Sequence, residues 1–159
     1  MPPMTEPVRV SREIAAPPEQ VWAMVADLTR MGEWSPETTG GSWRGGASGP
    51  AVGARFRGWN ANGRRRWFTS TVVTRCEPGT CFEFAVSAVG LPIARWTYDF
   101  EPTSSGCQVT ESFTDTRGGI AKALGGPVSG VTDRPTHNRV GMEQTLANLA
   151  AAAEGATAA

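Results

Sequence analysis

The sequence predicts an α+β fold in which a curved antiparallel sheet of about seven strands wraps around one long C-terminal helix, with one or two short helices after the first strand. Three observations carry this prediction. A strand-like segment at residues 8–14 leads directly into a proline-started helix and a Trp-bearing turn. A long run of strand-like segments with Gly- and Pro-rich turns follows, and one apolar helical segment comes last. The 159 residues fit a single domain over 1–159.

The first strand and helix are read from residues 8–28. Residues 8–14 alternate between two faces, and we expect this strand at or near an edge of the sheet. Pro18 suits the first turn of a helix, because its missing N–H would have no partner there. This helix is expected over about 18–27. Its apolar side chains repeat at i, i+4 and i+7 and form one inward-facing stripe: Val21, Val25 and Leu28.

Six further strands follow the Trp-bearing turn. Glycine and proline spacing places them at 41–45, 52–60, 65–76, 80–88, 93–102 and 107–115. Asn62-Gly63 is the strongest hairpin signal, because both central positions of a tight primed turn need positive φ. Residues 77–79 and 103–106 are two more hairpin connections, so the sheet is predicted to be antiparallel. In strand 93–102 one face is aromatic and the other polar.

The C-terminal part contains a glycine-rich connection and the long helix. Residues 116–134 include six glycines or prolines, so we expect only a short helical piece around 120–124 and a mobile connection. The last helix is expected from about Pro135 to Glu154, with Thr132 or Asp133 as its cap and Gly155 at its end. Residues 155–159 are expected to fray. The apolar stripe of the helix is Met142, Leu146, Leu149 and Ala153.

Composition excludes several functional classes. Fifteen basic residues balance fifteen acidic ones, which argues against nonspecific nucleic-acid binding. The N-terminus lacks the features of a leader and no apolar run is long enough to span a bilayer, so we expect a cytoplasmic protein without stable membrane insertion. The three cysteines lack CxxC spacing and are interpreted as small strand or core residues. The sequence allows a homodimer but does not specify the oligomeric state.

Several short motifs together resemble a known family. They are the Ala-Pro-Pro-Glu-x-Val-Trp of 16–22, the Trp-Ser-Pro of 34–36, the Gly-Ala-Arg-Phe of 53–56, the Phe-Glu-Phe of 82–84, the Trp-Thr-Tyr of 96–98 and the Val-Thr-Glu of 109–111. With the order of elements, they resemble the polyketide cyclase/dehydrase branch of the START-like (SRPBCC, helix-grip) superfamily. That superfamily includes lipid carriers, polyketide cyclases and hormone receptors, so the resemblance implies a cavity rather than one activity.

A cavity is also expected on physical grounds. An alanine-rich helix cannot fill the space inside a curved sheet, so aromatic side chains either plug this space or line a slot for an apolar ligand. The candidate lining has a residue at the mouth, residues on strands and residues on the last helix. These are Trp34 at the mouth; Phe56, Trp67, Phe84, Trp96, Tyr98 and Phe113 on strands; and His137, Met142 and Leu146 on the helix.

Polar candidates within the cavity are few. Glu111 shares a face with Val109 and Phe113, where burial would raise its pKa. It is then a general acid or base, the partner of an arginine such as Arg57 or Arg95, or an ordinary paired glutamate. Tyr98, the only phenol, is either a hydrogen-bond donor to a ligand or a packed core residue. His137 is the only histidine, so we predict no metal site, and we predict no cofactor.

The residues therefore leave three functional hypotheses. The preferred one is binding or carrying of a hydrophobic small molecule, such as a lipid, polyketide or isoprenoid-like compound, between the sheet and the last helix. The second is a polyketide cyclase or dehydratase that positions a substrate and uses acid/base catalysis through Glu111 or Tyr98. The third is a structural or stress-associated protein without a ligand. The run Arg64-Arg65-Arg66 is interpreted as a solvated hairpin tip rather than a site for a phosphate or lipid head group.

Overall fold

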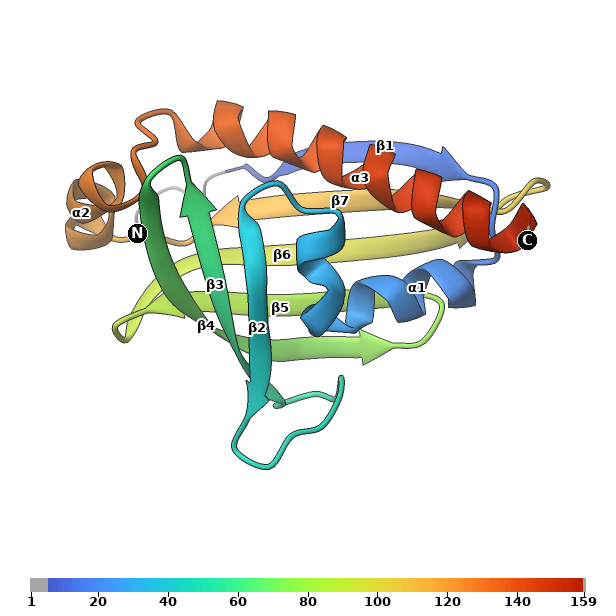
Figure 1. Cartoon of the computed structure of the whole chain (residues 1–159), viewed down its shortest axis with the longest axis horizontal. Coiled ribbons are helices and arrows are strands. Elements are labelled where there is room, and N and C mark those ends of the chain that lie inside the picture. Colours follow the sequence, from blue (N-terminus) through green and yellow to red (C-terminus); the bar gives the residue numbers. More distant parts are fainter. Residues whose placement is uncertain (1–5, 159) are drawn as a thin grey trace.

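The structure is a computed structural model that describes residues 6–158, with side chains described as far as residue 156 (Figure 1). Its elements confirm the predicted α+β class. They follow the order β1 (Val8–Ile14), α1 (Pro18–Ala26), the short 3-10 helix η1 (Leu28–Glu33), β2 (Thr38–Arg44), β3 (Arg55–Asn62), β4 (Arg65–Glu77), β5 (Cys81–Ala88), β6 (Leu91–Pro102), β7 (Cys107–Asp115), α2 (Gly119–Ser129) and α3 (Arg134–Ala158).

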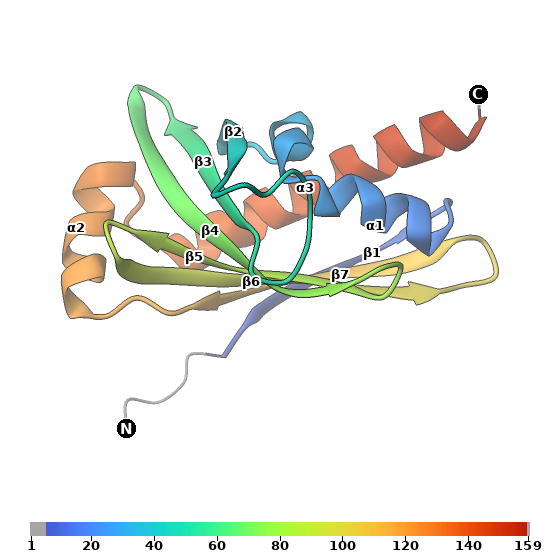
Figure 2. The same ribbon diagram turned by 90° about the horizontal axis from the view of Figure 1, so that it is seen from below.

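The strands form one antiparallel sheet with the order β1-β7-β6-β5-β4-β3-β2. β1 lies at one edge, as predicted, and β2 lies at the other. The half of the sheet formed by β2, β3 and β4 rises toward the side that carries the helices, so the sheet is curved (Figure 2). α3 runs along β1 and β7 on this concave side, and α1 lies beside it (Figure 1).

Two glycines allow the edges of this sheet to close tightly. A Cβ on Gly106 would lie 2.2 Å from the backbone oxygen of Ile14, where the β6–β7 turn passes the end of β1. A Cβ on Gly41 would lie 2.3 Å from the backbone oxygen of Arg57 on the neighbouring strand. In both places the neighbour is backbone, which cannot rotate away, so only glycine fits.

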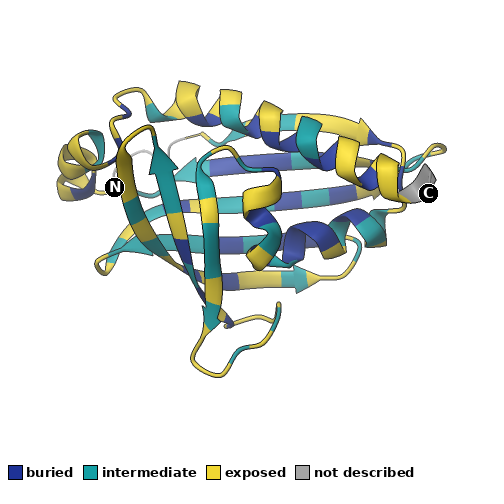
Figure 3. Cartoon of the chain, in the orientation of Figure 1, coloured by how far each residue is buried: buried dark blue, intermediate teal, exposed yellow. Residues whose placement is uncertain are grey.

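The hydrophobic core fills one half of the concave side. It lies under α1 and the C-terminal half of α3, where the buried residues of both helices face the sheet (Figure 3). The indole Nε1 of Trp22 donates a hydrogen bond to the backbone oxygen of Cys81 at 2.9 Å and ties α1 to β5. The core includes Val21, Val25, Phe82, Phe100, Leu146 and Leu149. The other half of the concave side, toward α2, is therefore free to hold a cavity.

The connection before α3 differs from the prediction. α2 covers Gly119–Ser129, which is longer than the expected piece at 120–124, and it continues through Gly125, Gly126 and Pro127. Hydrogen bonds from other elements explain this length: Asn62 Nδ2 donates to the backbone oxygen of Ser129 at 2.8 Å, and Arg65 Nη1 donates to that of Pro127 at 2.5 Å. These bonds satisfy carbonyls of the last turn, so tertiary contacts override the poor helix propensity.

The last helix begins as predicted but ends later. Asp133 is its cap, because its Oδ1 accepts a hydrogen bond from the backbone N–H of Thr136 at 3.2 Å. The predicted end at Gly155 is wrong, since α3 continues to Ala158. A glycine costs a helix only about 1 kcal/mol relative to alanine, and alanines surround this one. Ala159, part of the segment expected to fray, lies outside the described residues.

Candidate functional site

A large apolar cavity occupies the concave side between the sheet, α2 and the N-terminal half of α3. Its volume is about 960 Å³, within the range of small-molecule sites in proteins. Eight of the ten residues predicted to line a cavity do line it: Phe56, Trp67, Phe84, Trp96, Tyr98, Phe113, His137 and Met142. The aromatic side chains therefore line the space and do not plug it. In the wall, Trp96 packs on Phe113 with ring centroids 5.0 Å apart.

Trp34 and Leu146 do not line the cavity, contrary to prediction. Trp34 lies directly after η1, which turns its side chain into the core, and it is only 2% exposed. Asn148 Nδ2 donates to its backbone oxygen at 2.9 Å, so α3 covers this residue. Leu146 is 1% exposed and belongs to the same core. We predicted Trp34 at the mouth of the cavity, and this was wrong. The path of the chain through η1 determines where this side chain points.

Tyr98 and Glu111 form a buried polar pair in the cavity wall. They lie directly opposite each other on β6 and β7, and the Tyr98 hydroxyl donates a hydrogen bond to Glu111 Oε1 at 2.8 Å. Each is 2% exposed, and both line the cavity. Neither Arg57 nor Arg95 pairs with Glu111: Arg57 stacks over the ring of Phe68 and Arg95 lies exposed. The glutamate is therefore held by a neutral phenol rather than by a cation.

The electrostatics of this pair follow from burial. Removal from water raises the pKa of Glu111 to about 8, and the hydrogen bond from Tyr98 opposes this rise only in part. Burial and the neighbouring Glu111 raise the pKa of Tyr98 well above its ordinary value. At neutral pH the carboxyl group is mostly protonated and neutral. Glu111 Oε2 has no hydrogen-bond partner, so it is a buried polar atom available to a ligand.

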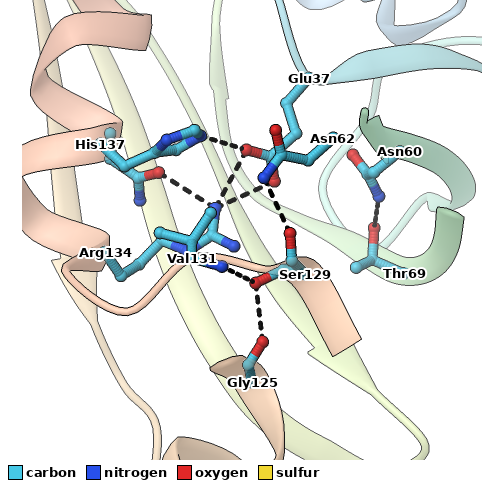
Figure 4. Close-up of polar contacts among 10 residues, drawn as sticks. Glu37, Asn60, Asn62, Thr69, Gly125, Ser129, Val131, Arg134 and His137 are labelled. Carbon is cyan, nitrogen blue, oxygen red and sulfur yellow. Dashed lines mark hydrogen bonds and ion pairs between the residues drawn. The ribbon is translucent and has the colours of Figure 1, made fainter. Parts of the chain in front are cut away.

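A polar cluster closes one side of the cavity near the start of α3 (Figure 4). Glu37, just before β2, accepts hydrogen bonds from Arg134 Nη1 at 2.9 and 3.0 Å and contacts His137 Nε2 at 2.9 Å. Arg134 Nη1 also donates to Asn138 Oδ1 at 3.4 Å. His137 therefore lies at the gap between helix and sheet, as predicted. The cluster joins the β2 edge of the sheet to α3.

Sequence reasoning missed most of this cluster. Glu37 and Arg134 are separated by 97 positions in the chain, and no local pattern brings them together. Asn60 and Asn62 could have been predicted as lining residues from the sequence. Both alternate with Phe56 onto the concave face of β3, and both line the cavity.

The described residues contain no group of three or more His, Cys, Asp and Glu side chains placed to hold a metal ion. All three cysteines are unpaired, and each lies in a strand, as the sequence interpretation had it. The cavity is thus an apolar space with a few hydrogen-bonding groups.

A curved antiparallel sheet, a long helix gripped on its concave side and an internal cavity define a helix-grip protein. The family described as polyketide cyclase / dehydrase and lipid transport matches residues 5–154. The chain belongs to this family, which confirms the predicted resemblance. A comparison with curated proteins finds no significant match.

Solved structures support the same assignment. The Polyketide_cyc-like protein from Corynebacterium glutamicum is 34% identical, with a TM-score of 0.62 over 94% of this chain and 91% of that one. A protein from Nitrosomonas europaea has a TM-score of 0.70 at 16% identity and covers 96% and 97% of the two chains. The di-domain ARO/CYC StfQ of the steffimycin biosynthetic pathway has a TM-score of 0.73 at 17% identity, and the match covers 96% of this chain and 52% of StfQ. The last two show the fold.

Proposed function

We propose that this protein binds or carries a hydrophobic small molecule, such as a lipid, polyketide or isoprenoid-like compound, in the cavity, with a neutral polar group of the ligand at Glu111. The observation that carries this proposal is the pairing of a cavity of about 960 Å³ with one buried, unpartnered carboxyl oxygen. An apolar ligand would replace water along the aromatic wall. Its hydroxyl or carbonyl group would satisfy Glu111 Oε2.

The charge around the cavity favours a neutral group at the Glu111 end. The basic residues that contact the cavity include Arg117 and Arg134, and each is paired with a carboxylate, Asp115 at 2.8 Å and Glu37 at 2.9 Å. Arg66 also contacts the cavity, but among the described residues the hydrogen-bond partner of Glu111 is Tyr98, so no cation is paired with this carboxyl group to hold a ligand carboxylate there. A protonated carboxyl donates to a carbonyl oxygen or exchanges hydrogen bonds with a hydroxyl group.

Binding is tested with the apolar dye Nile red and with competing ligands. Trp96→Ala removes part of the wall and should weaken dye binding about tenfold, through lost apolar contact. Trp59→Ala is the matched control, because Trp59 is 50% exposed and does not line the cavity. Equal affinities for wild type and both folded variants would contradict binding at this site. An absence of binding by dye and extracted lipids would favour the third hypothesis, a protein without a ligand.

A second candidate, a cyclase or dehydratase, is favoured by the proton held at Glu111. A buried carboxyl group with a pKa of about 8 beside a phenol can both donate and accept a proton near neutral pH. The fold shared with the ARO/CYC StfQ supports this candidate. Glu111→Gln separates the two: ligand binding should survive in a carrier, whereas turnover of a poly-β-ketone substrate should collapse in an enzyme. Native mass spectrometry with organic extraction identifies the compound that the protein retains.

A further inference from the structure

The end of the molecule that holds the cavity mouth exposes aliphatic side chains beside basic ones. α2, the β5–β6 turn and the β3–β4 hairpin all lie at this end in both views (Figures 1 and 2). Here the mouth face means the aliphatic residues Val89, Ile120, Leu124 and Val128 together with the basic residues Arg64, Arg65, Arg66 and Lys122. Three of the aliphatic residues, Val89, Leu124 and Val128, also line the cavity, so this face surrounds its entrance.

α2 leaves its large apolar side chains at least half exposed. Ile120, Leu124 and Val128 repeat at i, i+4 and i+8 and are 69%, 53% and 50% exposed. The helix instead buries the small residues Ala121 and Ser129. A helix on the surface of a soluble domain normally buries its apolar stripe. The stripe of α2 is therefore unpartnered in the isolated chain.

The β5–β6 turn adds a second unusual apolar residue. Val89 is 85% exposed and has a φ of 45°, followed by Gly90 with a φ of 79°. Two consecutive positive φ values suit Asn-Gly, whereas a β-branched residue is strained there. A valine at this position costs stability in the backbone and gains nothing from burial. A contact outside the chain would explain why an apolar side chain stands at the tip of this turn.

Basic side chains outnumber acidic ones at this end, where the carboxylate of Asp115 is paired with Arg117 and lies near Lys122. Residues 60–72, 84–95 and 116–132 contain no acidic residue, although the whole chain has fifteen acidic and fifteen basic residues. Their charged residues are Arg64, Arg65, Arg66, Arg95, Arg117 and Lys122. Arg64, Arg66 and Lys122 are exposed, and within residues 6–158 their side chains make no hydrogen bond or ion pair. The balanced net charge thus conceals a basic end.

We propose that the mouth face docks on an anionic lipid surface, with the aliphatic residues in the interfacial layer and the basic residues at the head groups. A second copy of this chain is a poor occupant, because a two-fold interface would bring the same basic residues of both copies together. A protein partner is less suited, since protein interfaces favour Trp, Tyr and Met, and these exposed residues are aliphatic. Aliphatic side chains flanked by Lys and Arg are typical of surfaces that lie on bilayers.

This inference is independent of what the cavity binds. It also assigns a role to the run Arg64-Arg65-Arg66, which the sequence analysis interpreted only as a solvated hairpin tip. Docking of this kind is peripheral and agrees with the finding that no helix among residues 6–158 is long and apolar enough to cross a membrane.

The test is vesicle sedimentation of the full chain. Vesicles of phosphatidylcholine with roughly 30 per cent phosphatidylserine should bind the protein at low salt and lose it at high salt, and vesicles of phosphatidylcholine alone should bind much less. Removal of one basic residue near the surface should weaken vesicle binding about fivefold. The double variant Arg64→Glu with Arg66→Glu should weaken it by more than this for each residue, because the charge is reversed. The control variant Arg12→Glu with Arg55→Glu makes the same change in net charge away from the mouth face. It should bind anionic vesicles more tightly than the Arg64/Arg66 variant does.

Two apolar variants separate docking from general charge effects. Ile120→Asn lies outside the cavity lining, and Val89→Asn relieves backbone strain, so both should fold well and still weaken vesicle binding severalfold. Nile red binding by Ile120→Asn should equal that of wild type, which keeps this test separate from the proposed ligand site. The proposal is overturned if anionic vesicles do not bind wild type at low salt, or if the mouth and control variants bind equally. Dimer formation that Ile120→Asn abolishes would also overturn it, in favour of self-association.

Discussion

The buried carboxyl group of Glu111 makes the stability of this protein depend on pH. Its pKa in the folded state is about 8, against an ordinary value of 4.5 that applies to the unfolded chain. Between these two values the folded state keeps a proton that the unfolded state has released. The stabilising effect of that proton is therefore fully present below pH 4.5. It decreases as the pH rises above 4.5 and is lost once the pH has passed about 8.

The magnitude follows from the same two values. Each pH unit between them is worth about 1.36 kcal/mol, so the loss reaches about 3 kcal/mol at pH 7 and about 5 kcal/mol above pH 8. Glu111→Gln keeps an oxygen that accepts the Tyr98 hydrogen bond but cannot ionise. The variant should therefore gain stability relative to wild type as the pH rises from 5 to 9, by several kcal/mol in total.

Urea denaturation of wild type and Glu111→Gln at pH 5, 7 and 9 measures this difference directly. Other titrating groups contribute equally to both proteins, so they cancel in the comparison. Glu143→Gln, which changes an exposed glutamate of α3, is the matched control and should track wild type. Parallel curves for wild type and Glu111→Gln across this range would refute the argument, because they would mean that Glu111 ionises as it does in water.

Three further predictions concern stability. Gly106→Ala should lower the free energy of unfolding, measured by urea denaturation, by about 3 kcal/mol, because the added Cβ meets backbone atoms. Gly49→Ala is the control: its Cβ would have nothing within 4 Å, so stability should change by less than about 1 kcal/mol. Similar values for the two variants would contradict the close approach at Gly106. Val89→Asn should raise the free energy of unfolding by about 1 kcal/mol, and a loss would show that the turn is unstrained. Glu37→Gln weakens the contacts with Arg134 and His137, so hydrogen exchange in the first turn of α3 should accelerate while the core of the sheet stays protected; unchanged exchange would mean that the cluster does not hold the helix.

Much of the fold was predictable because local patterns determine it. Alternation along 93–102 and 107–115 placed Tyr98 on the face of Trp96 and Glu111 on the face of Phe113, and the structure shows that both faces point inward. Both strands were predicted nearly to the residue. Even the pairing of these two residues carried a signal. The four-residue turn at 103–106 places Pro102 opposite Cys107, and counting back along both strands then places Tyr98 opposite Glu111.

The errors concern residues whose position depends on distant contacts. Trp34 belongs to the core because η1 and α3 enclose it, and its own sequence neighbours do not reveal this. α2 is longer than its glycines predict, because Asn62 and Arg65 of the β3–β4 hairpin hold its last turn. Helix propensity is a local quantity, and these hydrogen bonds link positions more than 60 residues apart.

The position of β1 constrains the order in which this protein can be completed. β1 pairs with β7 in the sheet, and Val8 lies opposite Phe113. During synthesis β1 therefore cannot pair until the chain has been made as far as β7. α3, which lies along β1, is made later still. The hairpins from β2 to β6 can form earlier, but their inward aromatic residues then face water or a chaperone. Closure of the concave side is therefore a late event in synthesis, and a ribosome that stalls before α3 leaves an apolar trough exposed.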